Sequence, residues 1–179
     1  MLKLKNKYYF SLIVSLLILL NGTDLYSQDN SGSFNSNIYA TIRPSSTKDP
    51  ISVQKILDLT FGDIAVTSSA GTITINPQNN VISNTGGIVL QPSVRNRAEF
   101  QLTGKQNQNF SISINQSSIV LQNIDYPGSS LNLSLTSYTI GRFNTSGRAS
   151  LYVGGTLNIG ANQPKGTYRA TFVINVNNN

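Results

Sequence analysis

The chain has 179 residues, 13 of them Lys or Arg and 7 Asp or Glu, with a formal net charge of +6. It contains no histidine, cysteine or tryptophan, which excludes Ser-His-Asp and Cys-His catalysis, disulfide bonds, and the usual zinc and copper sites. Charged residues make up only 11%, and Asn, Ser, Thr and Gly supply most of the polar positions, a mixture that favours β-structure with many turns.

The first segment in chain order, Met1–Ser27, has the three parts of a secretory signal peptide. Three lysines precede the apolar run Tyr8–Leu20, and a short polar stretch follows it. A membrane anchor is disfavoured because this run is short of the roughly 20 residues that a spanning helix needs. The sequence therefore predicts export to the periplasm, the outer cell surface or the extracellular space, with no stable membrane span after the leader is removed.

Residues 28–50 are predicted to be an N-terminal tail, loose up to residue 37, that carries a first short strand at Ile38–Ile42. One apolar face of this segment is formed by even-numbered positions, namely Phe34, Ile38, Ala40 and Ile42. These residues are candidates for a donor strand that completes the sheet of a neighbouring subunit. The simpler alternative, which we prefer, is that the strand pairs within its own domain.

Residues 51–179 are predicted to form one β-sandwich domain. Alternating apolar residues predict strands at Leu57–Phe61 and Thr72–Ile75, and a hairpin from Ala98–Leu102 and Phe110–Ile114. Only Ser52–Leu59 has room for a turn or two of helix outside the leader.

Further strands are predicted at Ile119–Gln122, Leu131–Leu135, Ala149–Ile159 and Thr167–Val176. The last of these has the clearest alternation, with Tyr168 and every second residue up to Val176 apolar. Turn signals recur at about 8–12 residues, as expected of an all-β sandwich. The fold class predicted from these patterns is all-β.

Six stretches in this order resemble a family of secreted bacterial domains, the domain of unknown function 4402 family. They are "LDLTFGDI", "GTITINPQN", "TGGIVL", "RAEFQLTG", "FSISIN" and "VGGTLNIGANQPKGTYRATFVINV". The resemblance implies an immunoglobulin-like or pilin-like β-sandwich. It also implies a subunit of the surface fibres and coats that chaperone and usher systems build, with like subunits or an assembly chaperone as partners. The family has no assigned chemistry.

The acidic residues give little support to an enzyme. A glycosidase needs two carboxylates that face one another, but Asp58 and Asp63 are five residues apart and would point to opposite faces of a flat strand. Glu99 alternates with apolar neighbours and is predicted to point outward. Without histidine, a general base would have to be a carboxylate, Tyr or Lys, so a hydrolase is retained only as a third hypothesis.

No cofactor, metal ion or nucleic acid is expected to bind. Calcium is the metal that oxygen ligands alone could hold, but no D-x-[DN]-x-[DN]-G loop is present. The nearest group to a basic patch is Arg95, Arg97 and Lys105, and the aromatic residues fall mostly on the apolar side of strands rather than between these cations.

The first hypothesis is therefore a non-enzymatic structural or adhesive subunit that works by β-strand pairing. The alternative is an extracellular carbohydrate- or ligand-binding module that uses exposed aromatic side chains on one face. The candidates near turns are Tyr126, Tyr138 and Phe143.

Overall fold

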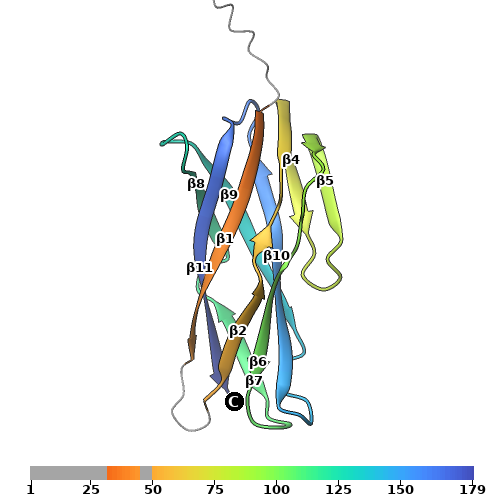
Figure 1. The fold of residues 1–179 in the computed structure, drawn as a ribbon, viewed down its shortest axis with the longest axis vertical. Coiled ribbons are helices and arrows are strands. Elements are labelled where there is room, and N and C mark those ends of the chain that lie inside the picture. Colours follow the sequence, from red (N-terminus) through yellow and green to blue (C-terminus); the bar gives the residue numbers. More distant parts are fainter. Residues whose placement is uncertain (1–31, 45–49) are drawn as a thin grey trace, which may run out of the picture.

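The computed structural model describes residues 32–44 and 50–179, and within these ranges it contains strands and no helix (Figure 1). The all-β prediction is confirmed. The predicted signal peptide, residues 1–27, lies outside the described residues. In the part of the chain that is described, no helix has the length and apolar character needed to cross a membrane.

The strands follow one another along the whole described chain. They are β1 (Gly32–Pro44), β2 (Ser52–Leu57), β3 (Leu59–Thr60), β4 (Ile64–Ile75), β5 (Ile82–Leu90), β6 (Ala98–Thr103), β7 (Phe110–Ile114), β8 (Ser118–Asn123), β9 (Ser130–Thr139), β10 (Arg148–Ile159) and β11 (Gly166–Asn178). They pair in the order β2-β6-β10-β9-β8-β11-β1-β4-β5, with β3 added on β1 and β7 on β11.

The sheet curls round and nearly closes on itself because strand β10 changes partner on one side. Its first half, Arg148–Val153, pairs with β6, and its second half, Gly155–Ile159, pairs with β4. Strand β9 accompanies both halves on the other side. The pairing of β10 with β4 thus links the two ends of the path β10-β9-β8-β11-β1-β4, which encloses the core (Figure 1).

Two glycines lie where β10 passes from β6 to β4. A side chain on Gly154 would collide with the backbone carbonyl of Ile75, and one on Gly155 with the backbone carbonyl of Ser134. Since both obstacles are main-chain atoms of neighbouring strands, neither can rotate away. The change of partner therefore requires residues without a Cβ atom.

Substitution Gly155→Ala is expected to lower the free energy of unfolding by about 3 kcal/mol, the upper end of the usual range for overpacking. The added methyl group must displace strand β9, because the Cβ atom would also lie 3.0 Å from Leu133 Cδ1. Urea denaturation of the two proteins measures the difference. Gly160→Ala is the matched control, since its Cβ would meet only the flexible Gln163 side chain, at 3.2 Å; an equal loss in both variants would contradict this explanation.

Inward-facing residues of nearly every strand form one continuous apolar core. In the final strand, every second residue faces the core, as predicted. Its fully buried side chains are Tyr168, Phe172, Ile174 and Val176. The phenol of Tyr168 donates to the Pro164 carbonyl at 2.7 Å, so its one polar group is satisfied inside the core.

The predicted hairpin of Ala98–Leu102 with Phe110–Ile114 is wrong. Strand β6 pairs with β2 and β10, whereas β7 pairs with β11. The loop between them is held by residues further along the chain: Gly104 N–H donates to Gly147 O and Phe110 N–H to Gly141 O, both at 2.9 Å. Alternation sets which side chains face inward, but it does not select the strand that lies alongside.

Two local predictions are also corrected. The possible helical turns at Ser52–Leu59 are strands β2 and β3, since pairing of β2 with β6 overrides any local helical preference. Residues 32–37, expected to be part of a loose tail, belong to β1 and continue the short strand predicted at Ile38–Ile42.

Candidate functional site

Strand β1 lies in the wall of the sheet between β11 and β4 (Figure 1). It runs parallel to β11, in register from Phe34 opposite Gly166 to Pro44 opposite Val176. Its other side is antiparallel to β3 and to the start of β4. Each of the other pairings between described strands is antiparallel. Strand β1 (Gly32–Pro44) therefore joins segments from opposite ends of the described chain. Below, this strand and its pairings with β11, β3 and β4 are called the seam.

Two of the four predicted donor-strand residues face the core. Ile38 is 1% exposed, and Ala40 is partly buried and packs against the core. The side chains of Phe34 and Ile42 lie outside what the structure describes, although their backbones keep the register with β11. Strand β1 thus pairs within its own chain, as the simpler alternative proposed, and its use as a donor to another subunit stays a prediction.

The outward side of the seam carries an aromatic residue between two cations. Tyr39 is partly exposed, and its ring centroid lies 5.7 Å from Lys55 Nζ and 5.9 Å from the guanidinium carbon of Arg169. These distances are within the range of cation–π attraction, which is weak at exposed sites. The contacts link β1 to β2 and β11 on the solvent side.

Of the three predicted ligand-facing aromatic residues, Tyr138 and Phe143 line the same groove, and Tyr126 is not among its lining residues. Tyr126, in the turn before β9, is 50% exposed, and Tyr138, near the far end of β9, is 37% exposed. The assignment of Phe143 to the surface is wrong, since it is only 1% exposed. Its ring lies 4.6 Å from that of Phe110 and packs over Gly104, where a Cβ atom would be only 2.6 Å from it.

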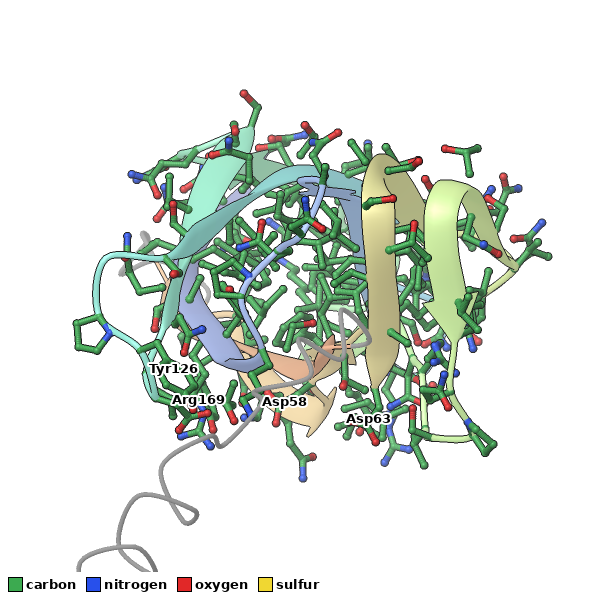
Figure 2. All side chains as sticks on the ribbon, turned by 90° about the horizontal axis from the view of Figure 1, so that it is seen from above. Asp58, Asp63, Tyr126 and Arg169 are labelled. Atoms are coloured by element: carbon green, nitrogen blue, oxygen red, sulfur yellow. The ribbon has the colours of Figure 1, made fainter. Side chains whose placement is uncertain are left out.

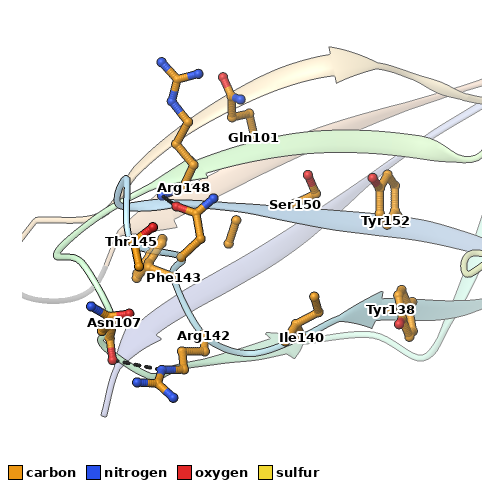
Figure 3. Close-up of a pocket in the computed structure, with 12 residues that line it drawn as sticks. Gln101, Asn107, Tyr138, Ile140, Arg142, Phe143, Thr145, Arg148, Ser150 and Tyr152 are labelled. Carbon is orange, nitrogen blue, oxygen red and sulfur yellow. Dashed lines mark hydrogen bonds between the residues drawn. The ribbon is translucent and has the colours of Figure 1, made fainter.

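Tyr138 has a neighbour that sequence reasoning did not single out. It stands directly opposite Tyr152 of β10 in the antiparallel register, and Tyr152 stands opposite Glu99 of β6. Both tyrosines line a groove of about 760 Å³ (Figure 3). In the sequence of β10, Arg148, Ser150 and Tyr152 alternate with the apolar residues Ala149, Leu151 and Val153. This alternation could have predicted that Tyr152 points outward.

Tyr152 is held in place by an arginine from outside the groove. The guanidinium carbon of Arg97 lies 3.6 Å from the centroid of the Tyr152 ring. The same guanidinium donates to the carbonyl oxygens of Pro77 and Gln78, at 2.7 and 2.6 Å. Because Arg97 is anchored to the backbone in this way, it fixes the orientation of the ring that it covers.

The described acidic residues Asp58, Asp63 and Asp125 make contacts within the fold, and Figure 2 labels the first two of them. Asp58 accepts from Lys55 Nζ at 2.8 Å, and Asp125 accepts from the Thr167 N–H at 2.6 Å. The carbonyl of Asp63 accepts from the guanidinium of Arg95, also at 2.6 Å. Burial lowers the pKa of Arg95, while the Asp63 carboxylate acts in the opposite direction. These contacts are those of turns and strand ends.

The structure brings together no metal centre among its described residues, where no group of three or more His, Cys, Asp and Glu side chains lies close enough to hold one ion. Two further carboxylates, Asp29 and Asp49, lie outside the described residues.

Comparison with protein families gives a match over most of the chain. The family described as domain of unknown function (DUF4402) matches residues 51–178. The chain belongs to this family. The resemblance carried by the six sequence stretches is confirmed. Searches among curated proteins and among solved structures each found no match.

The DUF4402 match begins at residue 51, next to the start of β2, and extends through β11. Strand β1 therefore lies outside the matched region, even though it occupies the space between β11 and β4. The seam is the first candidate site, because the sheet includes a strand that the DUF4402 match does not cover. The groove lined by Tyr138 and Tyr152 is the second.

Proposed function

We propose that the protein is an exported, non-enzymatic structural subunit of the cell surface, built as a pilin-like β-sandwich. In this proposal it joins a like subunit by exchanging strand β1, so that β1 of one copy fills the position between β11 and β4 of the next. The partner is a second copy of this chain, and an assembly chaperone would protect the seam before the exchange.

The single observation that carries the proposal is the position of β1. It lies outside the family match at residues 51–178, yet it covers β11 from Gly166 to Val176. Without it, β11 would present a row of unpaired backbone N–H and C=O groups, and β4 at Ile64–Val66 would keep its partner β5 but lose its partner on the other side. A sheet with such a gap accepts a strand from another chain by β-augmentation.

Exchange preserves the contacts of the seam. Within one chain, β1 has this backbone register with β11 and buries Ile38, and in the proposed exchange a β1 from a neighbour makes the same contacts. The free-energy difference between the two arrangements is then limited to the cost of association and any strain in the connection. Open-ended exchange of this kind generates chains of subunits.

Disulfide trapping tests the exchange. Tyr39 and Thr171 are direct partners in the β1–β11 register and both are exposed. Since the natural chain has no cysteine, Tyr39→Cys and Thr171→Cys each introduce a unique thiol, and paired residues in neighbouring strands are close enough for a disulfide. When the two single variants are exported from the same cells and oxidised, we expect disulfide-linked heterodimers on a non-reducing gel.

The control replaces Tyr39→Cys by Val89→Cys, which places an exposed thiol on the edge strand β5, away from β11. The double variant Tyr39→Cys/Thr171→Cys checks that the geometry permits the bond within one chain. Heterodimers no more abundant than in the Val89 control, alongside a closed disulfide in the double variant, would refute strand exchange.

A further inference from the structure

A second feature, independent of the seam, is the groove on the outer face of β6, β9 and β10. We propose that this groove binds an acidic oligosaccharide, with sugar rings stacked at its tyrosine end and a carboxylate held at its arginine end. The residues that carry the proposal are Tyr138, Tyr152, Gln101, Ser150, Arg142 and Arg148.

The register of three strands arranges these side chains in rows. Tyr152 lies between Glu99 and Tyr138, and the next outward-facing row places Ser150 opposite Gln101. Arg148 begins the strand, four residues before Tyr152, and so lies about 13 Å from it along β10. Figure 3 shows the two tyrosines at one end of the groove and the two arginines at the other, with Arg148 on the side of Gln101 and Arg142 on the opposite side, pointing away from each other.

The tyrosine end offers a rigid aromatic surface. Tyr138 is partly exposed, and Tyr152 is fixed by the guanidinium of Arg97, 3.6 Å from its ring centroid. An aromatic ring carries negative charge on its face, which attracts the slightly positive C–H groups on the apolar side of a sugar ring, while the phenol hydroxyl can hydrogen-bond to sugar hydroxyls. Because the ring orientation is fixed beforehand, less entropy is lost when a ligand binds.

The arginine end is cationic. Arg142 is oriented by the bond from its Nε to the Asn107 carbonyl at 3.1 Å, and its terminal nitrogens are not needed for that contact. The turn before Arg148 is ordered by Asn144, whose side-chain oxygen accepts from the Arg148 backbone N–H at 2.8 Å. No Asp or Glu is among the residues that line the groove. Guanidinium groups bind carboxylates through paired hydrogen bonds, so the charge favours an anionic ligand.

The same surroundings favour a sugar over a peptide. A peptide that binds as an added strand needs a free sheet edge, and β6 and the first half of β10 have none, since both are paired on both sides. The end of β9 at Thr136–Thr139 pairs only with β10, so an added strand would lie beyond Tyr138 and not over the groove. Over β6 and β10 the ligand is therefore contacted by side chains. Those available between the two ends are the amide of Gln101 and the hydroxyl of Ser150, which match the alternating donors and acceptors of sugar hydroxyl groups.

Isothermal titration calorimetry on the exported protein tests the proposal. The probes are tetrasaccharides of galacturonic, glucuronic and mannuronic acid, each with its carboxyl-reduced neutral counterpart. We expect at least one acidic probe to bind, with its neutral counterpart about tenfold weaker or more. Tyr138→Ala and Arg148→Gln should each weaken binding of that acidic probe about tenfold, equivalent to about 1.4 kcal/mol. Binding should also weaken with added salt.

Two variants outside the groove are matched controls. Tyr126→Ala removes another exposed tyrosine, and Lys165→Gln removes another exposed cation; both should bind like the natural protein, and thermal unfolding checks that all variants are folded. The proposal is overturned if no acidic probe binds, if the neutral counterpart binds as tightly, or if the groove variants bind like the controls. Equal affinity for an oligoglutamate of the same charge would also overturn it, in favour of an acidic peptide.

Discussion

A chain that begins at Ile51, and so lacks strand β1, is expected to lose stable folding. Strand β1 supplies the backbone pairing of one side of β11 from Gly166 to Val176 and the buried side chain of Ile38. Domains of this size are stabilised by only about 5–15 kcal/mol, and the loss of a central strand exposes two edges at once. Circular dichroism and thermal unfolding should show the absence of a cooperative transition.

Addition of a synthetic peptide with the sequence of β1, Gly32–Pro44, should restore that transition in the shortened chain. The same peptide with Ile38→Asp should fail, because a carboxylate at this position would be buried in an apolar core without a partner. If the shortened chain unfolds at the same temperature as the natural protein, β1 is dispensable and the seam cannot drive assembly. Rescue by both peptides would mean that backbone pairing alone is sufficient.

Substitution Phe172→Ala is expected to lower the free energy of unfolding by about 3–5 kcal/mol, the usual cost of removing a buried phenylalanine ring. Phe172 is 1% exposed and lies on β11 directly opposite Ala40 of β1. Because Ala40 is small and β11 is held on both sides by other strands, the neighbours can close only part of the cavity. Guanidinium denaturation measures the loss.

The preceding residue on the same strand provides the control. Thr171 is exposed, and Thr171→Ala should change the free energy of unfolding by less than about 0.5 kcal/mol. Similar losses for both variants would mean that β11 does not present one face to the core and the other to solvent. The comparison therefore tests the alternation itself rather than the general sensitivity of the strand.

Alternation in the sequence predicts most strands and their inward faces, because it is a local property of a half-buried strand. The segment Tyr168–Val176 is an example, since the residues predicted to face inward include the buried Tyr168 and Phe172. Alternation does not predict which strands pair with one another. The short loop after Thr103 suggests a hairpin, but its backbone groups bond to residues 141–147 and lead β7 to β11 instead.

For the candidate site residues, too, local sequence predicts exposure in some cases, whereas contacts between distant segments decide the others. Tyr138 is placed on the surface by its position near a turn, and the structure leaves it partly exposed. Phe143 has a similar position in the sequence but fills a space over Gly104, which depends on a contact between segments almost 40 residues apart. Tyr152 escapes notice because its importance comes from lying opposite Tyr138 and beneath Arg97.

The sequence by itself determines the all-β class, the family and the set of residues available for chemistry, since these follow from composition, periodicity and short motifs. Only the tertiary structure decides that β1 runs parallel to β11, and that two tyrosines share a row at one end of a groove whose other end carries two arginines. The physical reason is that backbone hydrogen bonds between strands are nearly independent of side-chain identity. Which strands meet, and in what register, is set by the packing of the whole core.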